Sequence, residues 1–146
     1  MARWGNCDYT QMEQLMKRME KFERVDKEEL CRDLAVEIAA RLLRMAKRRT
    51  PVGVYPLSSG KTGGTLRRAW DIDNKKLVAV KRGNAYEVTI MNSTEYASYV
   101  EFGHRTSNHM GFVPGVYMLT VSEQELKKTA PRIIERKLMQ RLSEVF

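Results

Sequence analysis

The sequence predicts an α+β domain with two N-terminal helices (one long), a small antiparallel β-sheet of about four strands and a C-terminal helix. Three patterns support this prediction. Apolar residues recur at helical spacing in residues 10–24 and 26–49, alternate with polar residues between 66 and 91, and return to helical spacing after residue 122. The chain length of 146 residues fits a single domain.

The first expected helix, residues 10–24, is amphipathic. Its apolar face consists of three methionines, a leucine and a phenylalanine: Met12, Leu15, Met16, Met19 and Phe22. Methionine side chains adapt to irregular surfaces. We expect this face to pack on the protein's own core, and an exposed methionine stripe at an assembly contact is the alternative.

The second expected helix runs from Asp26 to about Arg49. Asp26 with Glu29 resembles a capping box, and the helix should end before Pro51 because a residue that precedes proline disfavours helical geometry. Basic residues crowd its last turns: Arg44, Lys47, Arg48 and Arg49. The helix dipole favours cations there, and contact with phosphates is the alternative for this cluster.

Three segments, 66–72, 76–81 and 86–91, are expected to be strands, the last two joined into a hairpin by the turn Arg82–Ala85. Trp70 should anchor the sheet against the long helix.

The final helix is expected to begin at Ser122, which with Glu125 resembles a capping box. Pro131 lies well inside that helix and predicts a kink.

Charge and cysteine content restrict the function classes. The 26 Lys and Arg against 18 Asp and Glu give a net charge of +8, spread along the chain, which favours weak attraction to acidic partners without predicting a nucleic-acid-binding arm. Cys7 and Cys31 are far apart and outside any metal-binding pattern, so both are expected to be free thiols. No apolar run has the length of a signal peptide core or a membrane span, and we expect no membrane contact.

Residues 51–65 form a glycine- and proline-rich stretch that we expect to be a flexible loop. The sequence Gly60-Lys61-Thr62 invites comparison with a phosphate-binding loop. That motif needs a glycine where Tyr55 stands and a preceding strand where a helix is expected. We therefore expect an assembly loop, with Tyr55, Leu57 and Lys61 as its contact residues.

The segment from Glu95 to Leu119 holds both histidines of the chain among aromatic residues and glycines. His104 and His109 are five residues apart, a spacing that fits no recognised zinc pattern, and no nucleophile is paired with a base. We expect no catalytic residues, no metal and no cofactor. Glu101 is expected to pair with Arg67 or Arg68 in a structural contact.

Several short motifs occur in a fixed order: TP, TG-x-L-R-x-x-W, a strand ending in Asn, YA-x-YVEFGHR and FVPG-x-YML. They comprise Thr50-Pro51, Thr62-Gly63, Leu66-Arg67, Trp70, Asn92, Tyr96-Ala97, Tyr99–Arg105 and Phe112–Leu119. In this order they resemble the small head–tail joining proteins of tailed phages, the neck or tail-completion family of minor structural tail components. The lengthened loop at 51–65 is a departure from that pattern.

The resemblance implies a virion structural protein of a tailed phage or prophage that is not an enzyme. Its copies would form a ring, a hexamer, in the neck between the head connector and the tail-terminator or tail-tube proteins. It would be present in the host cytoplasm during assembly and then in the virion. Basic residues on the ring lumen would contact the passing DNA without reading its sequence.

Aromatic and polar residues of the 95–119 segment are the candidate assembly interface, since aromatic residues are enriched at interfaces. The candidates are Tyr96, Tyr99, Glu101, His104, Arg105, His109, Phe112 and Tyr117. The resemblance implies that residues 96–103 form a packed turn and that residues 111–119 return as a strand. A flexible loop between them, at about 103–111, is expected to contact the next protein. Val100 and Phe102 are expected in the core. Two other functions stay open at this point: a stand-alone basic nucleic-acid-binding protein, and a metal-dependent hydrolase using His104, His109 and Glu101.

Overall fold

The computed structural model describes residues 10–21, 23, 27–72 and 77–145. The helices are α1 (Thr10–Lys21), α2 (Lys27–Arg49), α3 (Thr65–Arg68), α4 (Ala97–Phe102) and α5 (Met118–Val145), with a 3₁₀ turn, η2, at Leu57–Ser59. The strands are β1 (Trp70–Ile72), β2 (Val80–Arg82), β3 (Ala85–Glu87), β4 (Ile90–Asn92), β5 (Gly103–Arg105) and β6 (Phe112–Pro114). The predicted α+β class, with helices at both ends of the chain, is confirmed.

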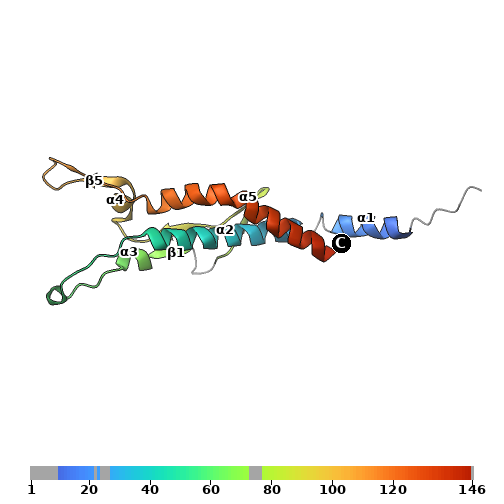
Figure 1. The fold of residues 1–146 in the computed structure, drawn as a ribbon, viewed down its shortest axis with the longest axis horizontal. Helices are drawn as coiled ribbons and strands as arrows, with labels where there is room; N and C mark the ends of the chain where they lie inside the picture. The colour runs from blue at the N-terminus through green and yellow to red at the C-terminus, as the bar shows by residue number, and fades with distance from the viewer. Residues whose placement is uncertain (1–9, 22, 24–26, 73–76, 146) are drawn as a thin grey trace, which may run out of the picture.

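The long helices α2 and α5 lie side by side and antiparallel, and they form the body of the molecule (Figure 1). Along the pair Leu30, Ala39, Leu126 and Ile133 are buried. Ion pairs follow the same seam. Arg141 of α5 lies 3.1 Å from Asp33, and Lys137 lies 3.5 Å from Glu37. Acidic residues of α2 thus face basic residues of α5, and these opposite charges favour one register of the two helices.

Glu37 is the most connected carboxylate of this seam. Its Oε1 accepts a hydrogen bond of 2.9 Å from Arg41, one turn further along α2. This hydrogen bond lowers the pKa of Glu37 below the ordinary value of 4.5; burial acts in the opposite direction, and the Lys137 charge lowers the pKa further.

The C-terminal helix begins four residues earlier than predicted. It starts at Met118, so Ser122 is a buried residue inside the helix and not its cap. The Ser122 hydroxyl donates to the Met118 carbonyl at 2.6 Å and accepts from Arg49 at 3.1 Å. Pro131 lies within the helix, whose direction changes near the middle, in agreement with the predicted kink (Figure 1).

The strands form separate two-stranded antiparallel sheets, β1–β4, β2–β3 and β5–β6, and not one sheet of about four strands. The predicted hairpin is present, with Arg82 opposite Ala85 and Gly83 at a φ of 60° in the turn. The predicted strand 86–91 is divided, because β3 pairs with β2 while β4 pairs with β1. The predicted strand 76–81 begins outside the described residues, and its end lies in β2.

The first predicted strand, 66–72, is correct only from Trp70 onward. Residues 65–68 form α3 instead, whose Arg68 N–H donates to the Gly64 carbonyl at 2.9 Å. Gly64 has a φ of 89°, which suits glycine at the entrance to this turn. The helical turn directs Leu66 into the core, where it is buried.

A cluster of four buried residues, together with the exposed Arg67, ties the C-terminal end of α2 to β1 and to the start of α5. We call it the Thr50 junction: Thr50, Leu66, Arg67, Trp70 and Met118. The Trp70 indole donates to the Thr50 hydroxyl at 2.6 Å, and that hydroxyl donates to the Ala46 carbonyl at 2.7 Å. Arg67 donates through Nε and Nη2 to the Thr50 carbonyl, at 3.2 and 2.8 Å. Trp70 therefore anchors its strand against the long helix, as predicted.

Glu101 caps α5. Its Oε2 accepts from the Leu119 N–H at 3.0 Å, and its Oε1 accepts from the Thr120 N–H at 2.8 Å. Two of the free N–H groups at this helix start are satisfied, and a carboxylate there is also favoured by the helix dipole. The expected pairing of Glu101 with Arg67 or Arg68 is wrong, because Arg67 binds the Thr50 carbonyl and Arg68 binds the Gly63 carbonyl.

Asn92, at the end of β4, completes the framework around the junction. Its amide donates to the Leu66 carbonyl at 3.0 Å, and its Oδ1 accepts from the Thr94 N–H at 3.1 Å. Several residues of the motifs that carry the family resemblance form hydrogen bonds between segments that are distant in the sequence. They are Thr50, Arg67, Trp70, Asn92 and Glu101.

Helix α1 extends beyond the α2–α5 pair (Figure 1). Its apolar residues Met12, Leu15, Met16 and Met19 are exposed. The expectation that this face packs on the protein's own core is wrong for these four residues, because α1 lies past the end of the helix pair. Phe22 and Asp26 lie outside the described residues, as does Cys7, whereas Cys31 is an exposed free thiol.

Candidate assembly surface

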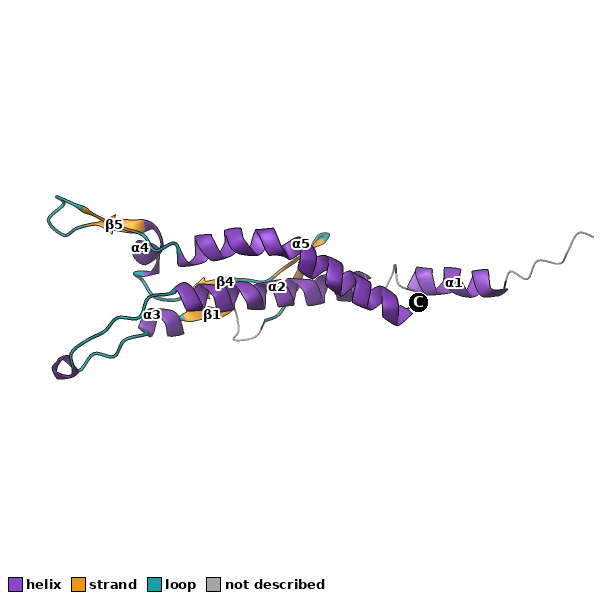
Figure 2. Cartoon of the chain, viewed as in Figure 1, coloured by secondary structure: helices purple, strands orange, loops and turns teal. Residues whose placement is uncertain are grey.

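Two projections leave the molecule at the end opposite α1 (Figure 2). The first, residues 51–64, follows α2 directly, and we call it the loop arm. The second, residues 103–114, follows α4, and we call it the hairpin arm. Both extend past the α2–α5 pair and expose apolar side chains.

The loop arm is narrow at its base. A Cβ atom on Gly63 would lie 1.8 Å from the Gly53 carbonyl oxygen, so the two sides of the arm approach each other as only glycine allows. At the tip, the 3₁₀ turn is closed by a bond of 3.0 Å from the Ser59 N–H to the Pro56 carbonyl. Leu57 is fully exposed there. This apolar residue is presented to the outside by an arm of defined shape.

Lys61 and Tyr55 face each other across the loop arm. The Lys61 ammonium lies 5.9 Å from the centre of the Tyr55 ring, within range of a cation–π contact. Lys61 has no carboxylate within ion-pair distance among the described residues. The only charged side chain of the arm is therefore available to a partner.

The hairpin arm is a β-hairpin with Gly103 opposite Pro114 and Arg105 opposite Phe112. A Cβ on Gly103, whose φ is 85°, would lie 2.5 Å from the Val113 carbonyl oxygen. The tip is closed by hydrogen bonds of 3.0 Å from the Thr106 N–H to the Gly111 carbonyl and from the Gly111 N–H to the Thr106 hydroxyl. Met110 at this tip is 87% exposed. The mobility of residues 103–111 stays a prediction.

Helix α4 places aromatic rings at the base of the hairpin arm. Tyr99 meets His104 edge-on with ring centres 5.8 Å apart, and Phe102 meets Tyr117 with centres 6.5 Å apart. Phe102 is 61% exposed, so its predicted core position is wrong. The reason is helical geometry: Val100 and Glu101 face inward, which turns Tyr99 and Phe102, three residues apart, outward. Val100 packs against the core cluster, as predicted.

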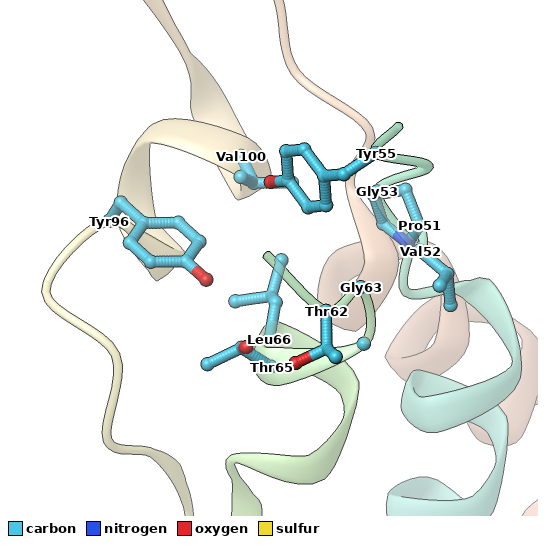
Figure 3. Close-up of a pocket in the computed structure, with 11 residues that line it drawn as sticks. Pro51, Val52, Gly53, Tyr55, Thr62, Gly63, Thr65, Leu66, Tyr96 and Val100 are labelled. Carbon is cyan, nitrogen blue, oxygen red and sulfur yellow. The ribbon is translucent and has the colours of Figure 1, made fainter. Parts of the chain in front are cut away.

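A pocket of about 260 Å³ lies between the base of the loop arm and α4 (Figure 3). Its walls include Val52, Tyr55, Leu66, Tyr96 and Val100. The two tyrosine rings lie on different sides of Leu66, whose side chain points between them (Figure 3). The lining is mixed, with these apolar side chains beside Thr62, Thr65 and glycine backbone, and the volume is enough for an aliphatic side chain.

The candidate residues named from the sequence fall into two groups. Ten are exposed on the arms or beside them: Tyr55, Leu57, Lys61, Tyr96, Tyr99, His104, Arg105, His109, Phe112 and Tyr117. Glu101 is the exception, since it is 6% exposed and serves as a cap. Sequence reasoning missed Val54, Phe102, Met110 and Val116, all exposed and apolar. Val54 and Met110 lie in the two loops that the sequence predicts as contact loops, 51–65 and 103–111, although neither residue was singled out. Nothing local marks Phe102.

The histidines do not form a site with Glu101. His104 lies on β5 and His109 at the hairpin tip, while both Glu101 oxygens accept hydrogen bonds at the start of α5. Within the described ranges, no group of three His, Cys, Asp or Glu side chains is placed to hold a metal ion. The same residues include no helix long and apolar enough to cross a membrane.

The α2–α5 pair thus carries two arms at one end, and both arms expose apolar side chains. Residues 13–103 match the model of the HK97-gp10-like family, described as "Bacteriophage HK97-gp10, putative tail-component". The match covers more than half of the chain, and the chain belongs to this family of phage tail components. No curated protein and no solved structure matches it. The matched range includes the loop arm and Glu101, and it ends where the hairpin arm begins.

Proposed function

We propose that this protein is a head–tail joining protein, a tail-completion component whose copies form a ring in the neck of a tailed phage or prophage. The observation that carries the proposal is the pair of arms, which present exposed apolar residues at one end of a rigid framework in a chain of the tail-component family. Exposed apolar patches mark protein contacts. The protein acts by binding and carries out no catalysis.

The hairpin arm is the element that docks on the adjoining head-connector or tail-terminator protein. Its strands are paired and hydrogen bonds close its tip, while Phe112 and Met110 are exposed. An arm that is already folded loses little conformational entropy on binding. His104 and Arg105 on β5 add polar contacts at the edge of this surface.

The basic residues at the end of α2 support a contact with DNA in the ring lumen. Arg44 and Arg48 are exposed, one helical turn apart, and neither has an ion-pair partner among the described residues. Such a contact is with phosphates and depends steeply on salt. An isolated protein that binds duplex DNA tightly at physiological salt would instead favour a stand-alone nucleic-acid-binding function.

The direct test is electron imaging of particles assembled with and without this protein. The proposal expects complete heads and complete tails that fail to join in its absence, and restored joining when the protein is added back. Normal joining without the protein would refute the proposal.

A further inference from the structure

We propose that the loop arm binds the pocket of a neighbouring copy of the same chain, with Leu57 as the inserted side chain. This inference rests on the ring of the proposed function and names the contact that closes it. It concerns only contacts between copies, so it can fail while the head–tail joining role stands.

The first argument is the match between the tip and the pocket. Leu57 is fully exposed on a projecting turn. The pocket walls include Val52, Tyr55, Leu66, Tyr96 and Val100, beside two threonines and three glycines. Burying an exposed leucine side chain favours association by about tenfold or more. An apolar side chain and a pocket at different places on one chain make a head-to-tail contact, which closes into a ring when the rotation allows it.

The second argument is that Leu57 cannot enter its own pocket. Val52, Gly53 and Tyr55 of the same arm form one wall, and only Pro56 separates Tyr55 from Leu57. The narrow contact of Gly53 with Gly63 and the fixed φ of Pro56 hold the arm outward. From Pro51 to Leu57 the chain spans at most about 20 Å, about twice the diameter of a helix with its side chains. At full extension the arm is therefore long enough to contact a copy that lies alongside.

The third argument is charge. The loop arm carries one charged residue, Lys61, and the segment 93–100, which contains Tyr96 and Val100 of the pocket wall, carries one, Glu95. Glu95 is exposed and has no ion-pair partner among the described residues. At the other wall of the pocket Arg68 donates to the Gly63 carbonyl and adds a positive charge, so Lys61 of an entering arm should lie on the Glu95 side.

The test is disulfide trapping between two separately purified variants. Both carry Cys7→Ser and Cys31→Ser; one also carries Ser58→Cys beside the tip, and the other carries Thr65→Cys at the pocket. After mild oxidation of the mixture we expect a reducible dimer that contains both variants. The control pairs Ser58→Cys with Ser143→Cys, an exposed serine at the far end of α5.

Two further changes sharpen the test. Leu57→Ser in the Ser58→Cys variant should lower the yield of mixed dimer about tenfold, since the lost burial corresponds to at least that factor in affinity. Lys61→Glu in the arm variant should lower the yield, and Glu95→Lys in the pocket variant should restore it. A mixed dimer no more abundant than in the Ser143→Cys control, or a yield that Leu57→Ser leaves unchanged, would overturn the proposal.

Discussion

The Thr50 junction and the two arms lie at the same end of the molecule but differ in construction. In the junction nearly every polar group has a partner: the Trp70 indole, the Thr50 hydroxyl and the Thr50 carbonyl are all hydrogen-bonded. On the arms, Leu57 and Met110 are exposed and apolar. Stability is thus concentrated in the junction and its helix cap, and exposed contact area in the arms.

The comparison indicates that folding and assembly depend on separate residues. Mutations in the junction should lower the free energy of unfolding, whereas mutations on the arms should leave it unchanged and affect joining. The predictions below test this separation, in order of decreasing effect on stability.

Among these variants, Trp70→Ala should lower the free energy of unfolding most. It removes a buried aromatic side chain from the core cluster and the partner of the Thr50 hydroxyl, so we expect a loss of about 3–5 kcal/mol in unfolding free energy. Urea unfolding followed by circular dichroism measures it. Phe112→Ala is the matched control, because that aromatic side chain is exposed on the hairpin arm. Equal losses in the two variants would contradict the separation.

Glu101→Ala should cause the second largest loss of stability. It leaves the Leu119 and Thr120 N–H groups without their acceptor, which should cost about 1–3 kcal/mol. Glu101→Gln keeps one carbonyl acceptor and should lose less. Thermal unfolding of the three proteins gives the order wild type, Gln, Ala. If the Gln and Ala variants were as stable as the wild type, Glu101 would have no capping role.

Removing the Glu37 charge from the ion pairs between α2 and α5 should lower the free energy of unfolding by a smaller amount, which depends on pH. The folded-state pKa of Glu37 lies below 4.5, so its contribution is present above pH 4.5 and is lost as the pH falls through the folded-state pKa. Glu37→Gln should therefore reduce stability at pH 7 and flatten its decline in acid. Urea midpoints from pH 7 to 3 measure this. The control is Glu135→Gln, which removes the same charge at an exposed position. It should leave the dependence of the urea midpoint on pH as in the wild type.

Leu57→Ser on the loop arm should have the smallest effect on stability, within about 0.5 kcal/mol, because the side chain contacts solvent in the isolated protein. Its effect on association between copies should be much larger. Thermal unfolding together with the yield of trapped dimer separates the two. A large drop in the melting temperature would show that Leu57 packs within its own chain.

The sequence predicted the fold correctly where the apolar periodicity was strong and continuous. Helix α2 and its end before Pro51 follow from the stripe and from proline geometry. The start of α5 could not be read, because its cap is Glu101, a residue far away in the sequence. The local Ser122–Glu125 pattern resembled a capping box, and tertiary contact overrode it.

The candidate surface was predictable as a segment but not residue by residue. Clustered aromatics and glycines identified the 95–119 region, and most of the residues named there are exposed. Short α4 then decides which side chains face inward. Their orientation depends on the packing of Val100 against the core and on the hydrogen bonds of Glu101 to α5. These contacts are with distant parts of the chain, so the local sequence does not predict them. Glu101 and Phe102 were therefore assigned to the wrong sides.

The separation of framework from arms is tested most directly by one double variant of the hairpin arm, Met110→Ser with Phe112→Ser, measured for thermal unfolding and for head–tail joining in particles. Our account predicts an unchanged melting temperature and the loss of joining, with free heads and free tails in the images. Normal joining by this variant, at a normal level of folded protein, would contradict it.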